Sequence, residues 1–427
     1  MIIRVRHRFT GLWLHANFRK LWAGQSASLL GSQISGIAVP LAAIVMLDAT
    51  AIQMGILGAM AGVPALIGIY LGVWVDRRRR GPIVVGADIG RALLLALIPV
   101  AYLFDALTMN LLYAVGIGNG ALTMLFHIAY RSYLPSVVAR SQLVDANSKL
   151  ALAVSGTASV GPGAGGLLVQ FLVAPFAVAI GALMYVFSAL LFRSMRVTEV
   201  IASGGRESGA NSVSAIASIR EGFGFLRRNS VLIGIALMEG TLEFFASAWE
   251  AISLLYMVRE LDFSPGMIGA LASIGSVGLF AGSYLSPRVS RKIGVGPAIG
   301  IAIVIMSLSG FILPLAVGPT AAIYALVAVS EVAFLVGLVI YQVLHVSVRQ
   351  SMTPDSLQGR VTSIMVVTSR AAIPLGAILG GLMGHYLGLR MSLLISSAGM
   401  GAAVFWLVYF GGWRLREMPG VADAQRD

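Results

Sequence analysis

Three glutamates fall on one face of a strongly apolar segment in the second half of the chain. The segment covers residues 230–257, and its acids are Glu239, Glu243 and Glu250. On a helix, which turns by about 100° per residue, Glu243 lies about 40° and Glu250 about 20° from Glu239 around the axis. A charged side chain in apolar surroundings costs roughly 2.5–3.5 kcal/mol on insertion scales. Three aligned acids must therefore face water, a basic partner or exchangeable protons.

Two readings of this acidic face remain open. Repulsion between neighbouring carboxylates favours the neutral form of at least one, which suits a carrier of protons or cations. Alternatively, Arg370 is placed along its own apolar segment, 358–386, so that it can pair with Glu239 or Glu243. We therefore regard the three acids and Arg370 as candidates for coupling, with a buried ion pair as the alternative.

A second polar face occurs in residues 320–348. Gln342, His345 and Arg349 fall within about 40° of Glu331 on a helix. We take Glu331 as a further coupling candidate and Gln342 and His345 as candidates for lining a cavity. Arg349 is expected only to anchor the end of its helix.

Two smaller polar groups lie nearer the N-terminus. Gln25, Ser28 and Ser32 form a stripe that either lines a cavity or permits close helix packing through small residues. Asp88 and Arg91 are spaced to pair on one helix face, and we expect this pair to be structural.

An arginine-rich loop, GVWVDRRRRG, runs from Gly72 to Gly81. A short loop this basic stays in the cytoplasm and fixes the orientation of the flanking helices. Its one acid, Asp76, is able to accept free amides at a helix N-terminus. We interpret Gly72, Asp76, Arg77 and Arg80 as a conformational latch, the alternative being that the arginines only anchor the loop at the membrane.

The elements that must position these residues are membrane-spanning helices. The chain is 58% hydrophobic and only 11% charged, with a mean hydropathy of +0.88. A span needs about 20 mainly apolar residues. The sequence predicts an all-α polytopic membrane protein with twelve transmembrane helices, over residues 21–47, 54–75, 83–104, 109–130, 143–171, 175–192, 230–257, 265–286, 295–315, 320–348, 358–386 and 391–411.

The basic residues predict that both termini are cytoplasmic. Arg91 and Arg370 lie within spans, only Arg259 and Arg390 fall at the outer side, and every other Lys and Arg falls on the side of the arginine-rich loop. The expected location is the cell's inner membrane, with several passes.

The two halves of the chain resemble each other. Gly72 with Asp76 is echoed by Gly282 with Ser286, and GPGAGG at residues 161–166 is echoed by PLGAILGG at residues 374–381. We expect two pseudo-symmetric six-helix halves, at residues 1–192 and 230–412. A cytoplasmic linker with an amphipathic helix would cover 193–229, and a cytoplasmic tail 413–427. Parallel repeats with a site between them are typical of transporters.

Several functions are excluded or disfavoured. The absence of cysteine excludes disulfides and thiolate chemistry. The glycine-rich stretches lie in apolar helices and not after strands, so they are not phosphate-binding loops. The formal charge of +12 is spread over short loops, which argues against nucleic-acid binding. We expect no enzyme activity, metal or cofactor, and a monomer whose partners are lipid, protons and a small molecule.

Five stretches together resemble the major facilitator superfamily, and within it the drug-exporter branch that includes enterobactin exporters and macrolide-efflux proteins. They are NFRKLWAGQSASLLGSQ (17–33), the Asp76 loop with the following span, LPSVVARSQLVDANS (134–148), IREGFGFLRRN (219–229) and MTPDSLQGRVTSI (352–364).

The resemblance implies the role of two motifs. The loop of Asp76 would dock against span eleven when the protein opens outward. Gly161, Pro162, Gly165 and Gly166 would form an exporter-type glycine motif that shapes the exit route. Arg79 and Thr157 stand where the family patterns have glycine.

The function expected is therefore secondary active export of a small, partly apolar molecule, a drug, an antibiotic or a siderophore, by proton-coupled antiport. The alternatives are an importer or facilitator of the same fold and, from another class, a non-transporting receptor or a lipid scramblase.

Overall fold

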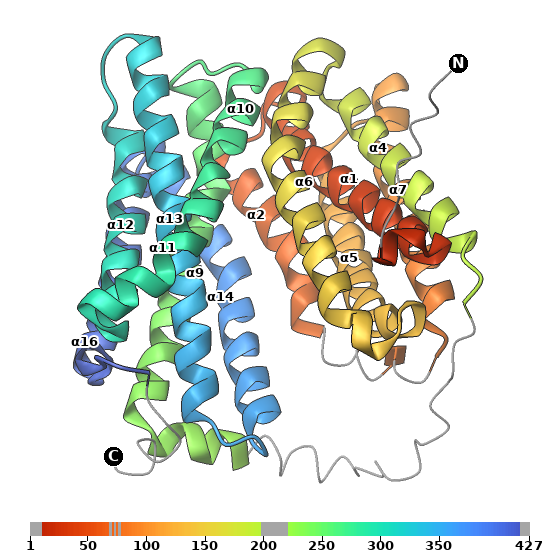
Figure 1. Cartoon of the computed structure of the whole chain (residues 1–427). Coiled ribbons are helices and arrows are strands. Elements are labelled where there is room, and N and C mark those ends of the chain that lie inside the picture. Colours follow the sequence, from red (N-terminus) through yellow and green to blue (C-terminus); the bar gives the residue numbers. More distant parts are fainter. Residues whose placement is uncertain (1–10, 68–70, 72–73, 76–77, 198–220, 419–427) are drawn as a thin grey trace, which may run out of the picture.

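The structure is a computed structural model that describes residues 11–67, 71, 74–75, 78–197 and 221–418. These residues form helices and contain no strand, and the helices divide into two bundles standing side by side (Figure 1). The predicted fold, two six-helix halves of the major facilitator type, is confirmed.

The first bundle is built from the N-terminal part of the chain. Its elements are η1 (Gly11–Leu14), α1 (Ala16–Met46), α2 (Ala51–Gly62), η2 (Val63–Ile67), α4 (Arg80–Leu103), α5 (Met109–Val137), η3 (Arg140–Gln142), α6 (Leu143–Leu172) and α7 (Ala174–Arg193). The second bundle consists of α9 (Ser230–Arg259), α10 (Pro265–Gly275), α11 (Val277–Ile293), α12 (Val295–Leu315), α13 (Thr320–Met352), α14 (Gln358–Tyr386), α15 (Leu389–Ala402), α16 (Val404–Tyr409) and η4 (Gly412–Arg414).

Eleven helical segments in the described part of the chain are long and apolar enough to cross a membrane. Within the second predicted span, 54–75, the structure describes α2, η2 and, after them, only residues 71, 74 and 75. Two predicted spans are interrupted: the eighth between α10 and α11, and the twelfth between α15 and α16. Helices satisfy their own backbone hydrogen bonds, which is why spans in lipid take this form.

Corresponding turns repeat in the two halves. Asp48 follows α1 and Asp262 follows α9, both with left-handed φ values, of 46° and 51°. Thr50 caps α2 by accepting from the Gln53 amide at 3.3 Å, and Ser264 caps α10 by accepting from the Met267 amide at 3.3 Å. Aspartate tolerates the left-handed region better than most residues, and Ser and Thr are good N-caps. The same short sequence pattern therefore builds the same turn twice.

The two ends of the molecule, at which the helices of both bundles begin and end, differ in charge. The arginine-rich end carries Arg78, Arg140, Arg227, Arg291 and Arg360; the opposite end carries the turns at Asp48, Asp105 and Asp262.

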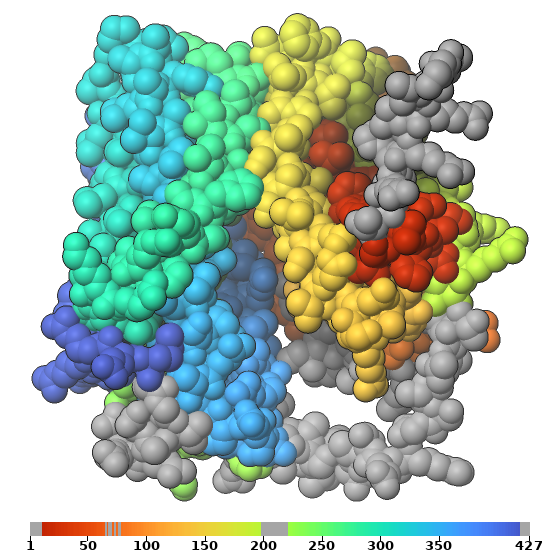
Figure 2. Space-filling model, in the orientation of Figure 1, coloured from red at the N-terminus to blue at the C-terminus, as the bar shows by residue number. Residues whose placement is uncertain are grey.

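The halves meet along two seams near the opposite end. In the seam between α2 and α14, a Cβ on Gly55 would lie 2.6 Å from the carbonyl oxygen of Ala377. In the seam between α6 and α10, a Cβ on Gly166 would lie 2.8 Å from Cα of Gly269. Only glycine allows backbones to approach this closely. Towards the arginine-rich end, in the lower part of Figure 2, the halves separate.

Candidate functional site

The acids of α9 line the second bundle at graded depth. Glu239 and Glu243 are half-buried, and Oε2 of Glu239 is inaccessible to solvent and has no hydrogen-bond partner. Glu250 is exposed.

Two arginines from neighbouring helices act on these acids. Arg370 of α14 is exposed and is the strongest charged neighbour of Glu243. Arg349 of α13 is the strongest charged neighbour of Glu239. It is only 8% exposed, and its Nε has no hydrogen-bond partner. Arg349 does lie in the last turn of α13, which ends at Met352, but it is buried in the bundle and not at an accessible surface, as an anchor would be.

None of these carboxylates is joined to an arginine in this conformation. Among the described residues, no nitrogen of Arg349 or Arg370 lies within 4.0 Å of a carboxylate oxygen of Glu239, Glu243 or Glu250, since the ion pairs found all involve other residues. The acids and arginines thus attract each other across a gap. Because no ion pair holds these groups, each can bind a different residue or a water molecule when the helices move, and the acids can also take up a proton.

Glu331 lies apart from this group, in its own small cavity of about 40 Å³ within the second bundle. Its expected neighbours on α13 do not share that cavity. His345 is buried, with its ring stacked on Tyr341 at 4.4 Å, and Nδ1 lies 3.0 Å from the Tyr341 carbonyl oxygen. Gln342 is exposed. Sequence spacing placed these residues on one face, but the bundle surrounds that face with different neighbours along its length.

In the first bundle, Asp88 and Arg91 form a fully buried ion pair on α4. The second carboxylate oxygen accepts from the Ser188 hydroxyl at 2.6 Å, and Arg91 donates to the Ser28 hydroxyl at 3.0 Å. These bonds tie α4 to α1 and α7. Only Nε of Arg91 is buried without a partner among the described contacts of this pair. A buried pair resists change, since breaking it leaves an uncompensated charge.

Aromatic rings close this cluster from two further sides. The Arg91 guanidinium carbon lies 4.4 Å from the ring centroid of Phe126 and 4.2 Å from that of Tyr185. Such cation–π contacts stabilise a desolvated guanidinium. Sequence spacing identified the ion pair but not the aromatic residues, which come from α5 and α7.

The polar stripe of α1 divides between core and accessible surface. Ser28 belongs to the buried cluster, and Gln25 is also buried, with an unpartnered Oε1. Only Ser32 is exposed. Of the residues expected to line a cavity, Ser32 and Gln342 are therefore accessible, whereas Gln25, Ser28 and His345 are not.

The glycine motif lies in two packed contacts. A Cβ on Gly161 would lie 2.5 Å from Cβ of Gln33 in α1, and one on Gly165 would lie 3.1 Å from Cα of Ile34. Gly166 faces α10. The Pro162 carbonyl oxygen also lies in the α6–α10 contact, 2.5 Å from where a Cβ on Gly269 would be.

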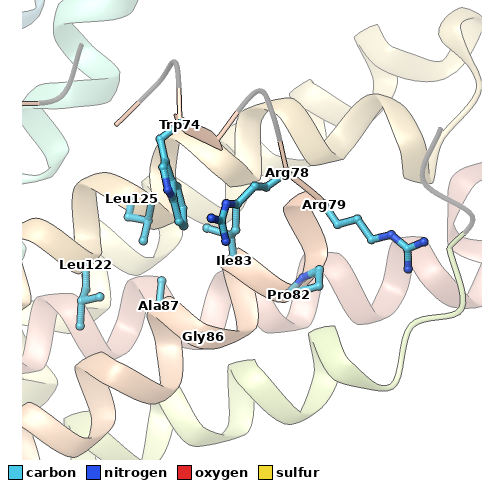
Figure 3. Close-up of a pocket in the computed structure, with 9 residues that line it drawn as sticks. All are labelled: Trp74, Arg78, Arg79, Pro82, Ile83, Gly86, Ala87, Leu122 and Leu125. Carbon is cyan, nitrogen blue, oxygen red and sulfur yellow. The ribbon is translucent and has the colours of Figure 1, made fainter. Parts of the chain in front are cut away.

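Three of the four residues assigned to the latch lie outside the described residues: Gly72, Asp76 and Arg77. Arg80 starts α4. A cavity of about 570 Å³ lies beside this loop, between α4 and α5, with the Arg78 guanidinium 4.6 Å from the centroid of the Trp74 ring (Figure 3). Because it lies within the first bundle, this cavity is separate from the carboxylates of α9.

The site is therefore a set of acids and arginines on α9, α13 and α14 of the second bundle that form no ion pairs with one another. No group of three or more His, Cys, Asp or Glu residues in the part of the chain searched is arranged to hold a metal ion. Carboxylates that form no ion pair are able to take up and release protons.

Comparison with known proteins establishes the family. Residues 12–424 match the profile of the family described as "Transmembrane secretion effector". The chain belongs to this family of the major facilitator superfamily. It is thus a multi-pass membrane protein with the family and fold of transporters, which are not enzymes.

Curated relatives of this transporter include named exporters. The enterobactin exporter EntS of Citrobacter koseri is 23% identical over 420 residues, covering 96% of this chain and 95% of the relative. Macrolide efflux protein A of Streptococcus pyogenes is 25% identical, covering 89% and 92%. The multidrug efflux pump Tap of Mycolicibacterium fortuitum is 28% identical, covering 80% and 83%.

Solved structures share the fold at low identity. The nucleoside transporter NupG aligns with a TM-score of 0.74 and 14% identity over 94% of this chain and 99% of its own. A bacterial homologue of the iron transporter ferroportin gives 0.72 in its inward-facing state, with 17% identity over 92% and 98% of the chains. Its outward-facing state gives 0.56, with 18% identity over 93% and 99%.

Proposed function

We propose that this transporter is a secondary active exporter of a small, partly apolar molecule, driven by proton entry through alternating access. The single observation that carries the proposal is the row of acids on α9 that form no ion pair, in a molecule whose two helix bundles meet at one end and separate at the other. The efflux roles named for three relatives favour export. The cargo class, a drug, an antibiotic or a siderophore, follows those relatives.

The proposed orientation places both termini and the arginine-rich end in the cytoplasm, according to the positive-inside rule. With that orientation the conformation described is open to the cytoplasm. The higher TM-score against the inward-facing ferroportin homologue supports this assignment. The opposite end is closed by the two glycine seams and by an ion pair between Arg259 and Asp48, one from each half.

Cavity and charge suggest the order of steps. An acid of α9 releases its proton to the cytoplasm while the halves are separated at the arginine-rich end, and the free carboxylate turns towards Arg349 or Arg370. Cargo enters the same space. After the halves rock, a proton from the outside neutralises the acid and the cycle returns. Each side thus gains access to one central site in turn.

Everted membrane vesicles test direction and coupling together. Respiration acidifies their interior, and an acridine dye reports the gradient. Addition of a macrolide or enterobactin to vesicles that contain the transporter should release protons and load the compound into the lumen. Vesicles without it provide the control. If the vesicles load the compound equally well after the proton gradient has been dissipated, transport is not coupled to protons. If the gradient instead drives preloaded compound out of the lumen, the protein is an importer.

A further inference from the structure

The cavity at Glu331 contains few polar groups that are free to bind a ligand. The Trp249 indole donates to the Gly310 carbonyl at 3.3 Å, and the Ser330 hydroxyl donates to the Val327 carbonyl at 2.8 Å. The remaining polar groups are the Ser309 hydroxyl and the acid itself. The cavity's other walls are Leu313 and the Phe334 ring.

That lining suits a proton and a water better than a metal cation. A water requires about 10–15 Å³ of such space, and this cavity has about 40 Å³. Hard cations require six or more oxygen ligands, which this lining does not supply.

No charged side chain in the described structure compensates Glu331. Its carboxylate forms no ion pair or hydrogen bond with another described residue, and no charged group acts on it electrostatically. Of the elements packed around it, α10 and α12 contain no titratable residue. From α9, Trp249 faces the cavity, and Glu250 follows it in sequence. The titratable residues of α11 begin at Tyr284, beyond the contact described next.

Glu331 also contacts the break between α10 and α11. A Cβ on Gly275 would lie 3.2 Å from Cβ of Glu331. At the break, the Ser276 hydroxyl donates to the Ser273 carbonyl at 2.6 Å. The Ser273 hydroxyl in turn accepts from the backbone amide of Gly163 in α6, at 2.9 Å. This last bond crosses between the halves, so a continuous path of contacts joins Glu331 to the α6–α10 seam.

We propose that Glu331 is a proton-binding site separate from the acids of α9, and that its protonation keeps the α6–α10 seam closed. This inference rests on the proposed proton coupling and adds the place where the proton acts on the fold. When the O–H bond breaks, the proton passes to the cavity water and a carboxylate remains. An unpaired charge in this half-buried and mainly apolar cavity is costly, so water enters, the packing against Gly275 loosens and α10 moves away from α6.

The test is a distance measurement in the full-length chain. Because the protein has no cysteine, Ala106→Cys and Val317→Cys introduce its only two thiols. Both positions are exposed, one on each half, at the opposite end. Spin labels on this reporter pair give the separation of the halves in lipid nanodiscs by pulsed electron resonance, with no cargo present.

Raising the pH should shift the reporter pair from the short to the long distance. The ratio of the two populations should change by up to about tenfold per pH unit while Glu331 titrates. In Glu331→Gln the short distance should persist at every pH. Glu331→Asp should restore the pH response of the distance. Glu260 is an exposed acid at the end of α9, and Glu260→Gln should leave that response unchanged. Ser273→Ala should weaken it.

A wild-type response in Glu331→Gln, or no response in the parent protein, would overturn the inference. If Glu331→Gln responds normally while everted vesicles still show proton-driven export, the proposed function stands and only this site is lost. A response that requires sodium at fixed pH would also contradict a proton site.

Discussion

At the scale of single residues, the transporter contains two kinds of charge within its helices. Asp88 and Arg91 are paired and buried, as a permanent structural element requires. Glu243 is half-buried and Arg370 is exposed, and they attract each other without forming an ion pair. The contrast is one of environment, since all four residues lie within membrane-spanning helices.

Glu243→Gln should abolish accumulation of cargo against a gradient but permit binding and exchange, because the amide keeps the shape and cannot titrate. Uptake of a labelled macrolide into energised everted vesicles measures accumulation. Exchange of the labelled macrolide in vesicles without a gradient measures binding and exchange. Glu260→Gln is the matched control. Full proton-driven accumulation by Glu243→Gln would transfer the carrier role to Glu239 or Glu331.

Asp88→Asn should destabilise the fold strongly, because it leaves Arg91 as an uncompensated buried charge, at a cost of about 3–5 kcal/mol. Asp145→Asn removes an exposed pair with Lys149 on α6, which contributes about 0–1 kcal/mol. Thermal unfolding in detergent should show a large fall in Tm for the first variant and almost none for the second. Equal Tm values would show that the buried pair is not structural.

At the scale of helices, the seams depend on the absence of side chains. α6 and α10 cross at Gly166 and Gly269, and α2 and α14 cross at Gly55 and Gly381. Each pair uses one helix from each half. The close contacts run along α2 from Ala51 to Gly62 and along α10 from Gly266 to Ser273.

Gly166→Val should open the α6–α10 seam, because its Cβ would lie 2.3 Å from the Pro265 carbonyl oxygen. The reporter pair should then show the long distance at a pH where the parent shows the short one. Gly156→Val, also on α6, has open space around its Cβ and is the matched control. An unchanged distance in both would show that the glycine contact does not determine closure.

At the scale of the whole molecule, the conformation described is one of several through which a rocking transporter passes. Its opposite end is held by two seams and by the exposed Arg259–Asp48 pair. Exposed ion pairs contribute only about 0.2–1 kcal/mol. The seams must therefore supply most of the closure, and the ion pair adjusts the balance.

Arg259→Ala should lower the ratio of closed to open forms by up to about fivefold, the equivalent of 1 kcal/mol. High salt should reproduce the effect in the parent protein and remove the difference between the two, because screening weakens exposed pairs. Arg390→Ala, the other arginine expected at this end, should have little effect. The reporter pair measures all three, and a salt-independent change would point to a packing defect.

The sequence by itself determined the all-helical membrane fold of two halves and the family. Both follow from local properties: runs of apolar residues of membrane length, and motifs repeated in both halves. The Asp88–Arg91 pair was equally readable, because its partners are one helical turn apart. These features need no knowledge of which helices are neighbours.

Tertiary structure decided which polar residues meet. Sequence spacing put Gln25, Ser28 and His345 on faces that might line a cavity, yet the surrounding helices bury them. It made Arg349 a surface anchor, whereas the bundle places it beside Glu239. The separate cavity of Glu331 and its contact with the α10–α11 break have no sequence signal. A helix's own periodicity fixes only which residues share a face, and the packed neighbours decide whether that face meets water, lipid or another charge.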